Sequence, residues 1–423
     1  GPQDYKSQGL SFFLQDSVRF GRLAVNAGMR TERFRHYATT GEVTQSFDWT
    51  WGPRVSLSYD LMGDGKQKLT AYYGKYFDPV RLNMTQFAGT FSGTVLEEQV
   101  FALGQWVNYR TRGGAQQPDA LFAPTIKTPW TDDLQFGYQI DLGKSMSFEA
   151  TYTKRRTRDI LEDYDLALYA YATDGVTTDY PGPLTGPDSL WLGLDYFGYS
   201  QNPGSNFVIG TLAGSKRDYQ GIDLSFRKRY SNNWQALAAY SYNKARGNSN
   251  SDSNADFQGD TLFLDPRAPN QYADQPGSIK HVAKAALSYK FNFGLEFGGF
   301  YRWNSGTLAS RTFRSSGRNL PLRVTAANAF EFAGFTNRWI APDSVGSLEN
   351  PAWGQLDLRA QYTRKFGKSG VGGELFVDCF NVFNDQGSIR NQDLVAGLGS
   401  ITYGEAFKWV GPRRFFLGAR IVF

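Results

Sequence analysis

The stretch TDDLQFGYQIDLGKSMSFEATYTKRR, residues 131–156, decides the fold. Its first half alternates apolar and polar residues, the apolar set being Leu134, Phe136, Tyr138, Ile140 and Leu142. A period of two is typical of a strand with one apolar and one polar face, because successive side chains point to opposite sides. Gly143-Lys144 then interrupts the pattern, and glycine allows the positive φ of a tight hairpin. The stretch predicts two antiparallel strands joined by a short turn.

The same alternation recurs along the whole chain, in thirteen segments. They are 10–20, 23–34, 52–61, 68–77, 131–142, 145–156, 218–230, 234–244, 279–291, 295–304, 354–366, 374–383 and 413–423. Each is close to or longer than the roughly 9 to 11 residues with which a tilted strand crosses a bilayer. The sequence therefore predicts an all-β, antiparallel protein.

The connections between the segments alternate strictly between short and long. The short ones, each with a Gly or Asn, are 21–22, 63–65, 143–144, 231–233, 292–294 and 367–373. The long ones are 36–51, 78–130, 157–217, 245–278, 305–353 and 384–412. Barrels of the Gram-negative outer membrane have short periplasmic turns and long extracellular loops. Counting back from a periplasmic Phe423 puts every short turn inside and every long loop outside, which predicts a transmembrane β-barrel of the outer membrane.

Composition is compatible with this prediction. The 423 residues have a mean hydropathy of −0.45, and no stretch approaches the roughly 20 apolar residues of a membrane helix. Only every second residue of a lipid-facing strand is apolar, so a barrel can have a polar average. The single cysteine, Cys379, excludes an intrachain disulfide and suits an oxidising periplasm or cell surface. A net charge of +5, spread over the strands, does not indicate nucleic-acid binding.

Thirteen strands cannot form a closed barrel of the usual kind, because thirteen is an odd number. Single-chain bacterial barrels normally have an even number, and an open edge would leave amides unpaired in lipid. We therefore expect further strands upstream, or another chain that completes the barrel. The chain also starts at Gly1 without the segments of a signal peptide, so it is expected to be processed, truncated or incomplete.

Several stretches carry a family resemblance. They include LAVNAGMR at 23–30, YYGKYFDP at 72–79, YQGIDLSFRKR at 219–229, LDLR at 356–359, FVDCFNVFN at 376–384 and GPRRFFLGARIVF at 411–423. With these stretches the chain resembles the C-terminal barrel portion of the TonB-dependent outer-membrane receptors and transporters, in particular their Oar-like branch.

The resemblance implies a barrel of 22 strands around an N-terminal plug, with a segment that contacts TonB. Residues 1–423 would then be the C-terminal part of the barrel, about the last 13 of 22 strands, with the plug and the first strands outside this chain. It also implies a receptor that binds a ligand at the outer loops and moves it through the plugged barrel. Lumen-facing polar residues would line the wall against the plug; they are Asp357, Arg359, Gln361, Glu374 and Asp378.

Two other functions stay open. The barrel could anchor large surface loops in a structural, adhesive or export-linked role, or it could be a passive porin. A plug with a TonB-contacting segment favours transport. The expected partners are the TonB energy-coupling complex, through the missing N-terminal part, the barrel-assembly machinery, lipopolysaccharide and other outer-membrane lipid, and a surface lipoprotein or other outer-membrane protein.

The last strand resembles the signal that the barrel-assembly machinery reads. Gly418, Ile421 and Phe423 have the expected spacing, whereas Phe416 stands where that pattern prefers a polar residue. In the alternative interpretation, Leu417, Ala419, Ile421 and Phe423 are simply the lipid face of a strand, and the two interpretations are compatible.

Aromatic residues in the long loops are the candidates for ligand contact, because loops on a rigid scaffold usually carry recognition. They are Trp106, Tyr109, Tyr169, Tyr171, Trp191, Tyr196 and Trp339. Such rings can stack on sugars, siderophores or peptides, or they can pack the loops against one another.

Catalytic residues and cofactors are not predicted. The two histidines, His36 and His281, have no nucleophile motif beside them, so the chain is not expected to be an enzyme. The loop with Asp252, Asn254, Asp256 and Asp260 suggests a weak calcium candidate. It lacks the Gly and the Glu of an EF-hand, and a solvated loop is the better interpretation.

A basic run lies at the predicted outer end of the sixth strand. Lys154, Arg155, Arg156 and Arg158 could meet lipopolysaccharide phosphates. A run that is half lumenal and half solvated is the favoured alternative.

Overall fold

The computed structural model is built almost entirely of β-strands, as predicted. It describes residues 5–78, 82–89, 95–102, 105–113, 120–165, 194–200, 203, 205, 207–249, 272–316, 336–340, 345–367, 371–393 and 400–422. Within these ranges no helix is both long and apolar enough to cross a membrane.

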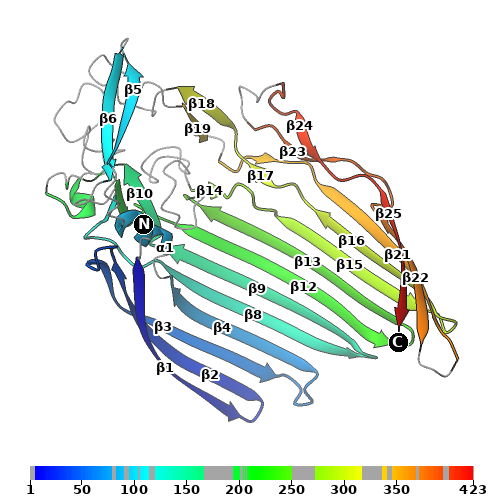
Figure 1. The fold of residues 1–423 in the computed structure, drawn as a ribbon. Helices are drawn as coiled ribbons and strands as arrows, with labels where there is room; N and C mark the ends of the chain where they lie inside the picture. Colours follow the sequence, from blue (N-terminus) through cyan, green and yellow to red (C-terminus); the bar gives the residue numbers. More distant parts are fainter. Residues whose placement is uncertain are drawn as a thin grey trace.

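One antiparallel sheet dominates the described part of the chain, and its path runs through thirteen strands in chain order. They are β1 (Lys6–Phe20), β2 (Leu23–Tyr37), β3 (Val43–Asp60), β4 (Gln67–Phe77), β8 (Trp130–Gly143), β9 (Met146–Arg158), β12 (Arg217–Ser231), β13 (Trp234–Gly247), β15 (His281–Lys290), β16 (Leu295–Asn304), β21 (Trp353–Lys365), β22 (Gly372–Phe380) and β25 (Arg414–Val422). The short β14 (Ala273–Asp274) pairs with the end of β13. Each of the thirteen predicted segments overlaps one strand of this path, which curves from β1 at one edge to β25 at the other (Figure 1).

The six predicted short turns all contain a residue with positive φ. Gly21 has a φ of 55°, Gly143 of 75° and Gly294 of 99°, and Asn232 and Asn233 form the turn between β12 and β13 with 53° and 70°. These residue types enter the left-handed region at the lowest cost, which is why they stand where the chain reverses.

One predicted boundary is corrected. Segment 36–51 was expected to be a loop, but β2 and β3 stay paired as far as Tyr37 opposite Val43, so only residues 38–42 connect them. Register irregularities lie between Glu32 and Phe34 and between His36 and Tyr37. A bulge breaks the period of two, so the strict alternation used for prediction stops before the hairpin does.

The remaining elements belong to the long connections and gather at one end of the sheet (Figure 1). They are α1 (Leu82–Gly89), β5 (Val95–Ala102), β6 (Gln105–Gly113), β7 (Ala120–Phe122), β10 (Leu161–Asp165), η2 (Leu194–Phe197), β11 (Phe207–Thr211), β17 (Leu308–Ala309), β18 (Thr312–Ser316), β19 (Thr336–Ile340), β20 (Leu348–Glu349), β23 (Ser388–Asn391) and β24 (Ala406–Trp409). The opposite end carries the six short turns. Strand order therefore reproduces the predicted separation of short and long connections.

The register gives the sheet two chemically different faces. Directly opposite residues point to the same side, so Leu69, Tyr138, Ala150 and Leu224 form one apolar row across four strands. Large apolar side chains on this face are exposed in the isolated chain: Leu14, Leu57, Leu69, Phe136, Ile222, Leu287, Phe297, Leu358, Leu375, Leu417 and Ile421. An apolar surface of this extent is typical of contact with a membrane.

A glycine–aromatic pair connects the last two strands on the other, polar face. Gly418 lies opposite Phe376, and a Cβ added to Gly418 would come within 2.2 Å of the Phe376 ring. The ring therefore occupies the space left by the missing side chain. Ile421 points to the apolar face and is 66% exposed, and Phe423 lies outside the described residues.

The two faces predict different effects of an added charge on folding stability. Leu287 lies on the apolar face opposite Ala236, and Leu237 lies on the polar face opposite Ala286, so both leucines stand at nearly the same height. We expect Leu287→Arg to cost about 2 kcal/mol of folding free energy in a bilayer, since a charge would face lipid. Leu237→Arg is the matched control and should fold normally. Equal losses in urea titrations of both variants in lipid vesicles would contradict this assignment of faces.

The Gly418–Phe376 pair predicts a coupled response. Gly418→Ala should destabilise the sheet by about 1–3 kcal/mol because the methyl group collides with the ring. The same substitution in a Phe376→Ala background should cost little. Refolding into detergent without the assembly machinery measures packing alone, so a full loss in the Phe376→Ala background would show that the ring is not the cause.

Candidate functional site

The polar face of the sheet carries paired charges at the end near β25. The register places Arg359 opposite Asp378, and the guanidinium donates two hydrogen bonds to that carboxylate, at 2.6 and 2.7 Å. The same guanidinium lies 4.5 Å from the centre of the Phe376 ring. Glu374 forms an ion pair with Arg420 at 3.6 Å. Bidentate pairs of this kind hold both side chains in a fixed orientation.

The five polar residues predicted to line the lumen wall lie on one face of the sheet. Asp357, Arg359 and Gln361 alternate along β21, and their partners in β22 include Asp378. Glu374 lies two pairs farther along the same face, opposite Thr363. Another ion pair on this face joins Arg155 of β9 to Asp133 of β8 at 3.0 Å. Four strands of the sheet lie between β9 and β21.

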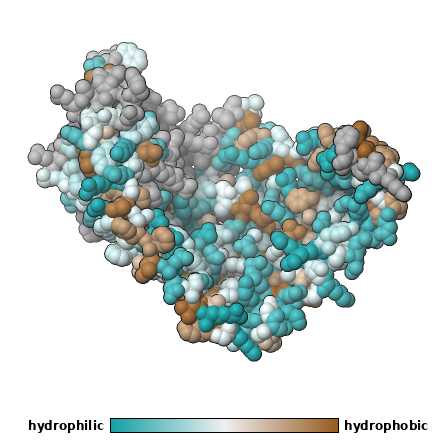
Figure 2. Space-filling model, turned by 60° about the horizontal axis from the view of Figure 1, so that its bottom comes forward, coloured by the Kyte–Doolittle hydropathy of each residue, from teal (hydrophilic) through white to brown (hydrophobic). Residues whose placement is uncertain are grey.

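A hollow of about 530 Å³ opens on this face between β12 and β22. A cross-strand row runs through it from Arg227 through Leu237, Ala286 and Phe300 to Asp357. The small residues Ala286 and Gly298 leave the space, Leu237 and Phe300 give it an apolar floor, and a cation and a carboxylate stand at its two ends. Such a hollow fits an apolar side chain or ligand group flanked by hydrogen-bonding groups. Figure 2 shows one side of the molecule, hollowed between its two ends, with hydrophilic and hydrophobic residues intermixed.

Two long connections fold together into a cap beside the ends of β2 and β3 that lie away from the short turns. The cap consists of α1 and a three-stranded sheet in which β11 pairs with both β10 and β7. Its core is apolar and includes Phe47 of β3; the other buried members are Met84, Ala88, Ala120, Phe122, Leu161, Phe207 and Ile209. Burial of the large side chains among these, each contributing about 1.5–3 kcal/mol, stabilises the cap against the sheet.

His36 is fully buried where the cap meets the sheet, 0% exposed. Its Nδ1 shares a hydrogen bond of 2.7 Å with the Thr85 hydroxyl of α1, and Phe47 lies edge-on at 5.9 Å. The Nε2 atom has no hydrogen-bond partner among the described residues. His36 lies two residues beyond the segment predicted to cross the membrane, and burial lowers its pKa from 6.5 to about 4. Sequence reasoning assigned His36 no role, although it continues the polar-face phase of Arg30 and Glu32.

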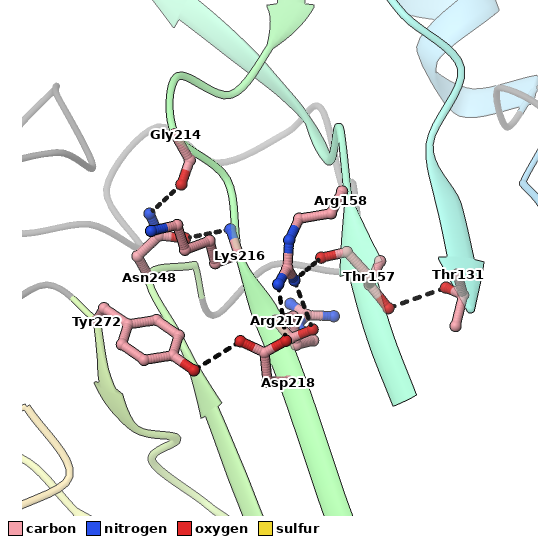
Figure 3. Close-up of polar contacts among 9 residues, drawn as sticks. All are labelled: Thr131, Thr157, Arg158, Gly214, Lys216, Arg217, Asp218, Asn248 and Tyr272. Atoms are coloured by element: carbon pink, nitrogen blue, oxygen red, sulfur yellow. Dashed lines mark hydrogen bonds and ion pairs between the residues drawn. The ribbon is translucent and has the colours of Figure 1, made fainter. Parts of the chain in front are cut away.

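A polar cluster holds the connections to the ends of β9, β12 and β13 (Figure 3). Arg158 donates to Asp218 at 2.9 Å, and the Tyr272 hydroxyl donates to the other oxygen of the same carboxylate at 2.6 Å. Asn248 accepts from the Lys216 amide at 2.7 Å and donates to the Gly214 carbonyl at 2.9 Å. The cluster therefore fixes three strand ends at which two long connections, 157–217 and 245–278, join the sheet.

Two of the predicted ligand-contacting aromatics have described side chains. Trp106 is 68% exposed in the β5–β6 hairpin, opposite Phe101. Tyr196 is half-buried: its hydroxyl donates to the Thr211 carbonyl at 2.6 Å and its ring lies edge-on to Phe197. Tyr196 thus makes the loop-packing contacts that the sequence left as an alternative.

The other candidates cannot be placed in a common site. Tyr109 and Trp339 belong to β6 and β19, but the structure describes only their backbone. Outside the described residues lie Tyr169, Tyr171 and Trp191, and also the calcium candidates Asp252, Asn254, Asp256 and Asp260. Among the described residues no group of three or more His, Cys, Asp or Glu could hold a metal ion.

The buried His36 predicts a pH-dependent cap. Its folded pKa lies below its unfolded value, so its stabilising contribution is complete above pH 6.5 and is lost as the pH falls towards about 4. The loss should reach about 3 kcal/mol. Hydrogen exchange of the α1 and β7 amides, corrected for intrinsic rates, should show falling protection over that range, and a His36→Gln variant should lack this dependence. An unchanged pH profile in the variant would assign the effect to other groups.

Comparison with known proteins adds the family. Residues 39–406 match the family model described as outer membrane beta barrel domain. The chain is 22% identical over 270 residues to the TonB-dependent transporter Oar of Myxococcus xanthus. This alignment covers 56% of this chain and 23% of that protein.

Solved structures share the fold. The ferripyoverdine receptor of Pseudomonas aeruginosa aligns with 98% of this chain and 38% of its own, at 13% identity and a TM-score of 0.52. The FrpB iron transporter of Neisseria meningitidis aligns with 98% and 45%, at 14% identity and a TM-score of 0.51. The chain thus spans about a quarter of the curated relative and less than half of these two structures. It belongs to the outer membrane beta barrel domain family, resembles TonB-dependent receptors, and crosses a Gram-negative outer membrane with its strands.

Proposed function

We propose that this chain forms part of the barrel wall of a TonB-dependent receptor that binds a ligand at its outer loops and passes it inward. The observation that carries the proposal is the polar face of the sheet, which has a hollow between β12 and β22. The cap lies at the long-loop end of the same sheet. A lipid-facing exterior requires an apolar outer face only; the paired charges and the hollow on the other face suit contact with a protein domain inside the barrel. In that arrangement a plug contacts Arg359, Asp378 and Asp357.

The sheet edges support a larger barrel. β1 and β25 end the hydrogen-bonded path of the described strands. Their free N–H and C=O groups would be costly in lipid. We propose that these are the last thirteen of 22 strands and that the first strands join β1 to β25. The plug and the TonB-contacting segment would precede them.

The loop end is proposed to face outward and to capture the ligand. The cap has a buried apolar core, whereas the β5–β6 hairpin projects away from the sheet and exposes Trp106 (Figure 1). An exposed indole on a hairpin can stack on a ligand ring. Tyr109, Tyr169, Tyr171, Trp191 and Trp339 remain proposed contacts, and Tyr196 would support them by packing.

A plug against the polar face can be tested by photo-crosslinking in the full-length protein. Phe300 lines the hollow, and Phe297 of the same strand lies on the apolar face; both are substantially exposed in the isolated chain. With benzoyl-phenylalanine at Phe300 we expect an intramolecular crosslink to an N-terminal segment. The same probe at Phe297 should crosslink lipid or nothing. Absence of the crosslink at Phe300 in correctly folded protein would contradict the plugged barrel.

The same preparations distinguish a transporter from a passive porin. In liposomes a plugged barrel excludes arabinose, whereas an open barrel of this size conducts it and the vesicles swell. Swelling by the unmodified full-length protein would overturn the proposal in favour of a porin. If the barrel is plugged but the protein has no TonB-contacting segment, the remaining function is the anchoring of large surface loops.

A further inference from the structure

The apolar face carries a band of charge at the long-loop end of the sheet. Cross-strand pairing joins six side chains of alternating sign into one row, because each lies directly opposite the next. The row is Lys75, Asp132, Arg156, Asp218, Arg246 and Asp274. Unlike the charged pairs of the polar face, these residues share the side that faces lipid.

Each carboxylate of the row already has a partner. Asp132 accepts from the Tyr73 hydroxyl at 3.0 Å. Asp218 is held by Arg158 and Tyr272, as Figure 3 shows. Asp274 forms ion pairs with Arg246 at 3.5 Å and with Lys280 at 3.4 Å. The hydrogen bonds and ion pairs of these carboxylates therefore go to residues other than Lys154 and Lys244.

Two lysines lie on the same face, one row farther from the long-loop end and therefore nearer to the apolar surface of the strands. Lys154 and Lys244 lie opposite Gln220 on its two sides. The strand spacing puts their Cα atoms roughly 10 Å apart. Neither forms an ion pair within the described part of the chain. Below them the apolar surface begins directly, with Ile222 between two tyrosines, Tyr152 and Tyr242.

We propose that Lys154, Gln220 and Lys244 bind a phosphate group of lipopolysaccharide, with Arg156 above them. Lysine ammonium groups and a side-chain amide can donate to phosphate oxygens from three adjacent strands. The tyrosines and Ile222 beneath receive the acyl chains of the same molecule. A zwitterionic phospholipid brings its own ammonium group and gains less from this surface than a multiply phosphorylated glycolipid does. The proposal rests on the outward orientation of the loop end.

The test measures lipopolysaccharide retained by the full-length protein after detergent extraction from the outer membrane. The variant K154Q/K244Q removes both ammonium groups. The control K284Q/K290Q removes two lysines from the polar face of β15. We expect about a tenfold or greater loss of bound lipopolysaccharide in K154Q/K244Q and none in the control. Equal retention in K154Q/K244Q and the parent protein overturns the proposal.

Reconstitution distinguishes the sources of phosphate. In nanodiscs the parent protein should bind added lipopolysaccharide in preference to its dephosphorylated form, and millimolar inorganic phosphate should not displace it. Equal binding of phosphatidylglycerol, or displacement by inorganic phosphate, would overturn lipopolysaccharide as the ligand. A maleimide reacting from outside intact cells with W106C, in a background without other cysteines, checks orientation separately. If W106C is labelled and lipopolysaccharide binding is unaffected by K154Q/K244Q, only this inference fails; if W106C is protected, the proposed orientation fails.

Discussion

The structure depends on one constraint: inside a bilayer, every backbone N–H and C=O must find its partner within the protein. Continuous pairing along the sheet meets that demand for the eleven strands between β1 and β25, and for one edge of each of those two. It also explains why the turns are so short at one end, since Gly and Asn let two residues reverse the chain without a gap in the ladder. The cap, which lies outside the sheet, solves the same problem by pairing β7, β10 and β11 with one another.

Once the ladder is continuous, register decides the chemistry of both faces. A shift of one residue in any strand would move its side chains to the opposite face. The rows are consistent across the sheet: Leu134 and Phe136 face one way with Ile222, while Asp133 faces the other way with Arg155. The charge row at the loop end and the paired charges beside the hollow are thus on opposite faces, although they use the same residue types. Each face meets a different neighbour.

The strands and turns could be predicted from the sequence because their signals are local. Alternation with period two and a Gly or Asn between segments are properties of neighbouring residues, and all thirteen segments and six turns were located in this way. The extension of β3 to Val43 was missed because bulges interrupt the period. The burial of His36 was missed because it depends on α1, which follows about fifty residues later. The predicted aromatics share residue type and loop position only, and such a list does not say that Tyr196 packs inward while Trp106 is exposed.

The parallel pairing of β7 with β11 joins the connection after β4 to the connection after β9. Ala120 lies opposite Phe207, and the buried core draws side chains from both segments. Connecting segments tolerate sequence change, and loops that pack independently can be exchanged one at a time. These two loops cannot, because replacing either removes part of a shared core. They form a single packing unit, and a chimaera that imports one of them has to import the other.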